Sequence, residues 1–192
     1  MYTAVKLLKS DLLSDNWYVL KKHTYEIHLK NGDVRTQVRE AYDRGNGAVI
    51  LLYNTTAKTV ILTRQFRLPT FINGNADGML IEACAGLLDK DDPESCIRRE
   101  AEEETGYRLS DVKKVYEAYM SPGSVTEILY FYIAAYDHSM KVNDGGGLEE
   151  EQEHIEVLEL PFAEAWSMME SGAIRDAKTI MLLQYLKLKG IF

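Results

Sequence analysis

GLLDKDDPESCIRREAEEETGY, residues 86–107, contains a helix whose two ends are both marked in the sequence. Asp92 is a good N-cap, and Pro93 suits the first helical position, where a missing N–H costs nothing. Gly106 can adopt the left-handed conformation that closes many helices. Ahead of the helix, Met79–Cys84 reads as a short apolar strand, followed by a loop at Ala85–Gly86. The expected unit is therefore strand, glycine loop and acidic helix.

The helix carries three carboxylates on one face. Glu100, Glu103 and Glu104 stand at i, i+3 and i+4, and like charges at this spacing repel one another. A divalent cation would relieve that repulsion, since Mg²⁺ takes carboxylate oxygens together with substrate phosphates and water. A solvated acidic face is the alternative reading of such a run. The glycine, the Arg99–Glu100 pair and the stop at Gly106 favour the metal site.

This stretch resembles the Nudix box, G-x5-E-x7-R-E-U-x-E-E-x-G-U, in which U is an apolar residue. The matching positions, in order, are Gly86, Arg99, Glu100, Ala101, Glu103, Glu104, Gly106 and Tyr107. The interval from Gly86 to Arg99 is one residue shorter than the general pattern, so Asp92 or Glu94 takes the place of the first glutamate. In the family that acid partners the box arginine and supports the loop.

The rest of the chain predicts an α/β (α+β) protein with a mixed sheet between helices, as in the Nudix fold. Residues 16–43 read as two β-strands with a type I′ turn at Asn31–Gly32. Further strands are expected at 47–54, 59–67, 112–120, 127–136 and 154–161, and helices at 161–170 and 173–189. We expect residues 1–44 to form an N-terminal antiparallel β-hairpin extension and residues 45–192 to form the Nudix hydrolase domain.

Composition limits the remaining classes of function. The chain has 192 residues, a net charge of −8 and 46% hydrophobic residues, which suits a substantial core and argues against binding to nucleic acid or an anionic membrane. Cys84 and Cys96 are expected to be buried, reduced thiols. The N-terminus shows no long apolar run. We therefore expect a cytoplasmic protein.

The order of motifs outside the box resembles the GDP-mannose hydrolases of the Nudix superfamily, nearly from end to end. That resemblance implies a Mg²⁺-dependent enzyme, with Mn²⁺ as a possible substitute, that cleaves a nucleotide sugar to GMP and mannose 1-phosphate. It also implies a homodimer in which the N-terminal hairpin is exchanged and the active site is shared.

The resemblance assigns roles to particular residues. The catalytic set is Glu100, Glu103, Glu104 and Glu151, and the metal ligands are the Ala85 carbonyl, Glu100, Glu104 and Glu151. Residues implied in substrate binding are Trp17, Val38, Arg39, Glu40, Arg67, Ala85, Gly86, Leu87, Glu104, Glu127, Glu150, Glu151 and Lys178. The general base is left open between Glu151, Glu150 and Glu153, in the loop that follows three glycines.

Three other functions remain possible from the sequence. An ADP-ribose or ADP-sugar pyrophosphatase would use the same metals and Arg67 with a different base pocket. A nucleotide-sensing Nudix domain would bind without cleavage, but such domains typically lose box carboxylates that are all present in this chain. A mutator-type nucleoside triphosphatase would leave the N-terminal strands without a clear role.

Overall fold

The computed structural model describes residues 1–88, 90–148 and 153–192, so the predictions for Glu150 and Glu151 lie outside the described residues. The chain divides into two compact units. The first unit combines Met1–Asn46 with Tyr119–Ile128, and the second combines Gly47–Ala118 with Leu129–Phe192.

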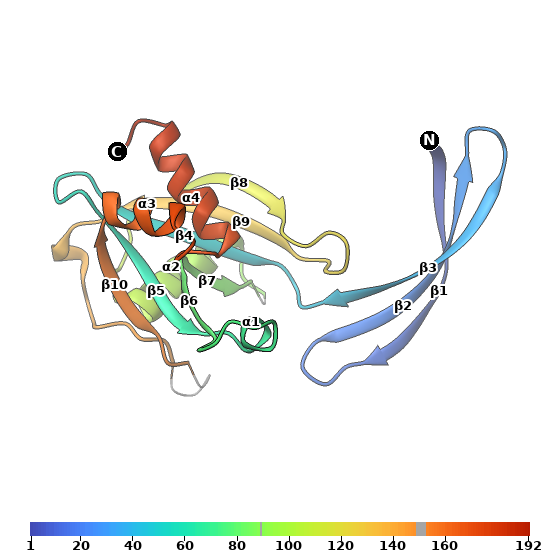
Figure 1. Cartoon of the computed structure of the whole chain (residues 1–192), viewed down its shortest axis with the longest axis horizontal. Coiled ribbons are helices and arrows are strands. Elements are labelled where there is room, and N and C mark those ends of the chain that lie inside the picture. Colours follow the sequence, from blue (N-terminus) through green and yellow to red (C-terminus); the bar gives the residue numbers. More distant parts are fainter. Residues whose placement is uncertain (89, 149–152) are drawn as a thin grey trace. The chain divides into compact units, whose positions relative to one another are not determined.

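The first unit contains an antiparallel sheet of three strands, β1 (Tyr2–Ser14), β2 (Val19–Leu29) and β3 (Val34–Asp43), in that order (Figure 1). The predicted hairpin is the β2–β3 pair. The sequence pattern did not predict a strand at β1. This strand pairs with β2 through three register shifts, which interrupt the regular alternation of its side chains. In the same unit, Thr126 donates its backbone N–H to the Tyr42 carbonyl at 3.1 Å.

The β2–β3 turn differs from the predicted two-residue type I′ turn. Gly32 donates its N–H to the Leu29 carbonyl at 3.0 Å, and Leu29 donates to the Asp33 carbonyl at 2.8 Å. Gly32 has a φ of 89°, whereas Asn31 is not among the residues with positive φ. The loop therefore has three residues, a type I turn closed by a left-handed glycine. Asn31 instead hydrogen-bonds to Asp33 through its side chain.

The second unit is built on a mixed sheet with the order β10-β5-β4-β9-β8. Its strands are β4 (Gly47–Asn54), β5 (Thr59–Phe66), β8 (Lys113–Tyr119), β9 (Ile128–Ala135) and β10 (Glu156–Pro161). β4 and β9 are parallel, whereas β5 is antiparallel to both β4 and β10. These five strands were all predicted, with boundaries within two residues.

The hairpin of β4 and β5 opens away from its turn, and two short strands occupy the opening. β4 pairs with β5 only at Leu52–Asn54, next to the turn. Beyond that point β6 (Met79–Glu82) pairs with β5, and β7 (Cys84–Leu87) pairs with β4. The predicted single strand is thus two strands, and the predicted Ala85–Gly86 loop lies within β7. Strand pairing with β4 keeps these two residues extended.

Helices cover both faces of this sheet (Figure 1). The helix α2 (Pro93–Thr105) packs Ile97 and Ala101 into a core with Ile50 and Leu52 of β4. Alternate residues of a strand point to opposite faces, so Leu51 faces the other side, where α4 (Ala177–Leu188) contacts β4. The helix α3 (Phe162–Glu170) contacts β10, β5 and α4. This arrangement confirms the predicted mixed sheet between helices.

A short helix, α1 (Leu68–Ile72), follows β5, and a 3-10 turn, η1, spans His138–Met140. Cys84 and Cys96 are both buried, as predicted. None of the helices found among the described residues has the length and apolar character needed to cross a membrane.

Candidate functional site

The acidic helix has the ends that its sequence predicted. The Asp92 carboxylate accepts hydrogen bonds from the backbone N–H groups of Glu94 and Ser95, both at 3.1 Å. Pro93 is the first helical residue, and Gly106 closes the helix with a φ of 82°. These caps fix the start and end of α2 and therefore fix which of its faces meets β7.

Two box glutamates lie directly against β7. A Cβ placed on Gly86 would lie 2.1 Å from Cδ of Glu100, so the Glu100 carboxyl group rests on the backbone of Gly86. The backbone N–H of Ala85 donates to Oε2 of Glu104 at 3.2 Å. The structure thus brings Ala85, Gly86, Glu100 and Glu104 together, as the Nudix resemblance implied.

Glu104 is buried and its carboxyl group has an altered acidity. Only 2% of the residue is exposed. Burial is the main cause that raises the pKa of Glu104 to about 8; a hydrogen bond with Cys84 opposes the rise, and the neighbouring charges of Glu100 and Glu153 add to it. A buried carboxyl group beside another acid is a site where a cation would stabilise the ionised form.

Arg99 offsets part of the repulsion within the helix. Its Nη2 lies 2.9 Å from Oε1 of Glu100, and its Nη1 donates to Oε2 of Glu103 at 2.8 Å. Glu103 therefore faces Arg99 instead of β7. The Arg99–Glu103 pair has i, i+4 spacing, at which an ion pair contributes about 0.3–0.5 kcal/mol. Arg99 thus stabilises the acidic face modestly and does not pair with Glu104.

Among the described acids that precede α2, the one that pairs with the box arginine is Asp91, which corrects the expectation of Asp92 or Glu94. Asp91 Oδ2 lies 3.7 Å from Nε of Arg99. Asp92 is occupied as the N-cap, and Glu94 accepts instead from Arg98 at 2.8 Å. The shortened interval in the box is thus met by an acid one residue before the helix cap.

A second charged cluster joins the ends of β5 and β6 to the start of α4. The Glu82 carboxylate accepts from Nε of Arg67 at 2.6 Å and from Nζ of Lys178. Lys178 also donates to Asp176 at 2.8 Å, and Asp176 is the N-cap of α4. Two of the predicted substrate-binding cations, Arg67 and Lys178, therefore share one buried carboxylate.

Glu82 and Asp176 were not among the predicted site residues. Glu82 is 3% exposed. Burial alone would raise the pKa of Glu82, but Lys178 and Arg67 outweigh it and hold the pKa below its ordinary value. The signal available in the sequence was a lone carboxylate inside the apolar run MLIEACAG. Such an acid needs a partner when buried, but the sequence does not say which one.

The glycine segment, Gly145–Gly147, forms backbone hydrogen bonds with the end of α2. Gly146 and Gly147 donate their N–H groups to the carbonyls of Glu104 and Glu103, at 2.9 and 3.1 Å. Glu153 follows, and its carboxylate accepts from the N–H of Leu148 at 3.3 Å. Of the three acids considered as general base, Glu153 is the described one, and its charge acts on Glu104.

Leu87 ends β7 in the second unit, where its carbonyl accepts from Sγ of Cys96 at 3.2 Å. The other predicted site residues that the structure describes belong to the first unit. Trp17 is 83% exposed. Val38, Arg39 and Glu40 are exposed on β3, opposite Thr24, His23 and Lys22 of β2. Glu127 lies 3.6 Å from Nε of Arg44. The role of these residues in substrate binding stays a prediction.

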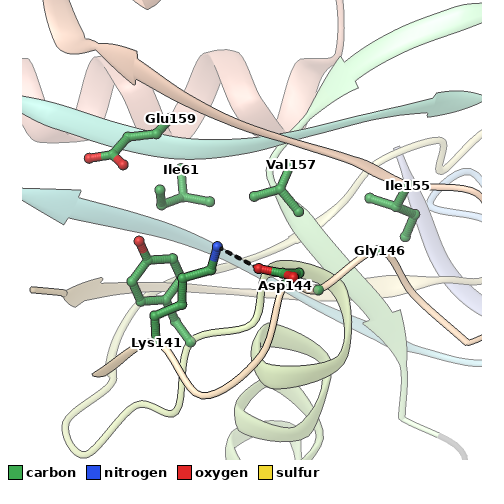
Figure 2. A pocket seen from close by; sticks show the side chains of 9 residues that line it. Ile61, Lys141, Asp144, Gly146, Ile155, Val157 and Glu159 are labelled. Carbon is green, nitrogen blue, oxygen red and sulfur yellow. Dashed lines mark hydrogen bonds and ion pairs between the residues drawn. The ribbon is translucent and has the colours of Figure 1, made fainter. Parts of the chain in front are cut away.

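A cavity of about 310 Å³ lies beside the glycine segment, on the α2 face of the sheet (Figure 2). Ile61, Ile155 and Val157 line it, and an ion pair of 3.2 Å joins Lys141 to Asp144 at its edge. None of the predicted site residues that the structure describes lines this cavity. The carboxylates against β7 are therefore a separate feature.

The donor groups suit a divalent cation that the substrate helps to bind. Within residues 1–88, 90–148 and 153–192, no three His, Cys, Asp or Glu side chains converge as a complete metal site. Mg²⁺ commonly takes only one or two carboxylates and completes its shell with phosphate oxygens and water. Glu100 and Glu104, side by side against β7, provide that number.

Comparison with known proteins agrees with this geometry. A sequence profile for the NUDIX domain matches residues 43–183, and a profile for the GDP-mannose pyrophosphatase NudK N-terminal domain matches residues 4–42. The solved structure of an ADP compounds hydrolase superposes with a TM-score of 0.72 over 99% of this chain and 98% of its own, at 18% identity. That structural match shows the fold, and the NUDIX profile identifies the family.

Two relatives that match nearly the whole chain identify the family within the Nudix superfamily. A GDP-mannose pyrophosphatase of Pectobacterium atrosepticum is 57% identical over 192 residues, which cover 100% of this chain and 98% of the relative. One of Salmonella typhimurium is 57% identical over 187 residues, covering 97% of each chain. The chain belongs to the Nudix superfamily and, within it, to the family of the GDP-mannose pyrophosphatases.

Proposed function

We propose that this protein hydrolyses GDP-mannose to GMP and mannose 1-phosphate in the presence of Mg²⁺. The observation that carries the proposal is the pair of carboxylates, Glu100 and Glu104, set against Ala85 and Gly86 in a chain 57% identical to GDP-mannose pyrophosphatases. Water is added across the diphosphate, one P–O bond to the bridging oxygen breaks, and that oxygen leaves with one of the two products.

The chain supplies groups for each part of this reaction. Glu100 and Glu104, with the Ala85 carbonyl, would hold Mg²⁺. The bound ion supplies charge neutralisation at the diphosphate and a water of lowered pKa. Arg67 uses Nε for Glu82, so its two Nη nitrogens, on a side chain that is 38% exposed, suit bidentate binding of a phosphate. The proton acceptor is drawn from Glu151, Glu150 and Glu153.

The first unit supports a dimer with a shared active site. None of residues 1–46 is buried in the chain, and β1 exposes a row of large apolar side chains, Val5, Leu7, Leu8, Leu12 and Leu13. A small sheet without a covered apolar face is marginally stable in water. A second copy of the chain would cover it and could bring Trp17 and Arg39 to the other subunit's carboxylates. Sedimentation of a monomer at working concentration would contradict this proposal.

Cleavage of a substrate panel tests the activity. Purified protein with Mg²⁺ should cleave GDP-mannose faster, in kcat/KM, than ADP-ribose or ADP-glucose, and should release mononucleotide. Faster cleavage of ADP-ribose would instead support the ADP-sugar alternative. Binding without cleavage would support a sensing domain. The buried thiols Cys84 and Cys96 suit the cytoplasm as the place of action.

A further inference from the structure

We propose that Glu82 is a positioning residue that holds Arg67 and Lys178 in place for the diphosphate of the substrate. The inference rests on the proposed function, since it concerns the same reaction. Glu82 is not part of the Nudix box. It is the last residue of β6, before the box begins. Its side chain connects three elements that are far apart in sequence.

The geometry divides the two carboxylate oxygens of Glu82 between two cations. Oε2 accepts from Nε of Arg67 at 2.6 Å, and Oε1 accepts from Nζ of Lys178. The Arg67 contact uses Nε, and none of the described residues hydrogen-bonds to its Nη nitrogens. Arg67 is thus held by one edge of the guanidinium group while its other edge stays available for a phosphate.

Lys178 is fixed from a second side. Asp176 accepts from its Nζ at 2.8 Å, and the same carboxylate caps α4 by accepting from the N–H of Thr179 at 2.9 Å. The Thr179 hydroxyl in turn accepts from the N–H of Ala83, next to Glu82, at 2.7 Å. The start of α4 and the end of β6 are therefore locked together around the two cations.

Glu82 and Lys178 of this cluster are largely buried. The side chains of Glu82 and Lys178 are 4% and 14% exposed, so the two charges depend on each other for the stabilisation that water would otherwise give. The cluster contains two acids, Glu82 and Asp176, and two cations. Removal of the Glu82 charge would leave Arg67 and Lys178 to repel each other. Arg67 would also lose the contact that orients its guanidinium group.

Glu82 does not itself have a role in contacting substrate. Both of its oxygens are occupied and its side chain is nearly inaccessible. Its effect must pass through Arg67 and Lys178. A double-mutant cycle with Arg67 therefore separates positioning from a merely structural contribution, because a structural defect would persist when Arg67 is absent.

The variants for the test are Glu82→Gln, Arg67→Ala and the double variant, with Glu117→Gln as control. Glu117 pairs with Lys114 on the exposed strand β8, so its loss leaves the cluster untouched. We expect E82Q to raise KM for GDP-mannose about ten-fold or more with a smaller change in kcat. In the R67A background, E82Q should add little to KM. E117Q should match the wild type.

Two outcomes would overturn the proposal: equal effects of E82Q with and without Arg67, or an unchanged KM in E82Q. If E82Q does not fold, Glu82→Asp is used in the same cycle, because it keeps the charge but shortens the side chain by one methylene. Inorganic pyrophosphate binding, measured by calorimetry, gives the cycle a readout independent of turnover. A wild-type protein that binds pyrophosphate but cleaves no GDP-mannose would reject the proposed function and leave the cycle decisive for Glu82.

Discussion

Gly86 lies against the carboxyl group of Glu100, with 2.1 Å between the position of a Cβ on Gly86 and Cδ of Glu100. A side chain at residue 86 and the observed position of Glu100 therefore exclude each other. The glycine is required here for space, since its φ is not positive. This close approach is what places a box carboxylate beside the backbone of β7.

Gly86→Ala should displace Glu100 and weaken the binding of Mg²⁺. We expect the Mg²⁺ concentration at half-maximal rate to rise about ten-fold or more, since orienting a metal ligand commonly has that effect. Gly123→Ala is the control, because Gly123 has nothing within 4 Å of its Cβ position and no positive φ. Rates measured against Mg²⁺ concentration for both variants provide the comparison. Equal Mg²⁺ dependence in the two would contradict this reading of Gly86.

Glu104→Gln should separate activity from stability. Since the pKa of Glu104 is raised to about 8, the metal-free protein holds this group mainly protonated at pH 7, and glutamine has nearly the same shape and polarity. The metal-free variant should therefore melt at or above the wild-type temperature. Its turnover should fall about 100-fold or more because a ligand of the cation is lost. Activity close to that of the wild type would remove Glu104 from the metal site.

The stability of the metal-free protein should depend on pH through the same group. The pKa of Glu104 is raised from 4.5 to about 8 on folding, so the folded state holds the proton more tightly than the unfolded state. Stability is then lost as pH rises from about 4.5 to about 8, by at most about 1.4 kcal/mol per pH unit.

Urea unfolding of wild type and E104Q in EDTA, at several pH values, measures the contribution of Glu104 to the pH dependence of stability. The free energy of unfolding of the wild type should fall relative to that of E104Q as pH rises across this window. Mg²⁺ binding should release protons in the same range, which calorimetry in buffers of different ionisation enthalpy detects. A difference between the two proteins that does not change with pH would refute the raised pKa.

The box helix was predictable because its signals are local. Asp92, Pro93 and Gly106 act on backbone groups within a few residues, so their spacing alone gives the ends of α2. The strands β4 and β5 were equally clear, because each is an apolar run bounded by a short turn. Three predicted site residues, Gly86, Glu100 and Glu104, follow from the box, and Ala85 follows from the wider resemblance. The structure brings these four residues together.

Features that depend on distant partners were not predictable. The run from Met79 to Leu87 divides at Ala83 because its two parts pair with different strands, β5 and β4. Asp91 faces Arg99 because the Asp92 carboxylate is used for capping. Glu82 meets Lys178 across 96 residues. In each case the sequence supplies a residue of the right type, and the choice of partner is made by tertiary packing.

Gly145→Ala should disturb the docking of the glycine segment on the end of α2. Gly145 has a φ of +69°, and a Cβ there would lie 2.5 Å from the Glu104 carbonyl oxygen and 2.7 Å from the Thr105 carbonyl carbon. Both neighbours are backbone atoms of the box helix, so neither can turn aside. The segment would have to move away from α2 and would carry with it Glu153, whose charge acts on Glu104.

Gly172→Ala is the matched control for this change. Gly172 has a similar φ of +78° but nothing within 4 Å of its Cβ position, so it shares the backbone strain and lacks the crowding. Both variants should lose about 1 kcal/mol from the left-handed conformation, and G145A should lose clearly more. G145A should also lower kcat, whereas G172A should keep the wild-type kcat. Equal melting temperatures and equal kcat in the two variants would show that the contact of Gly145 with Glu104 and Thr105 does not position this segment.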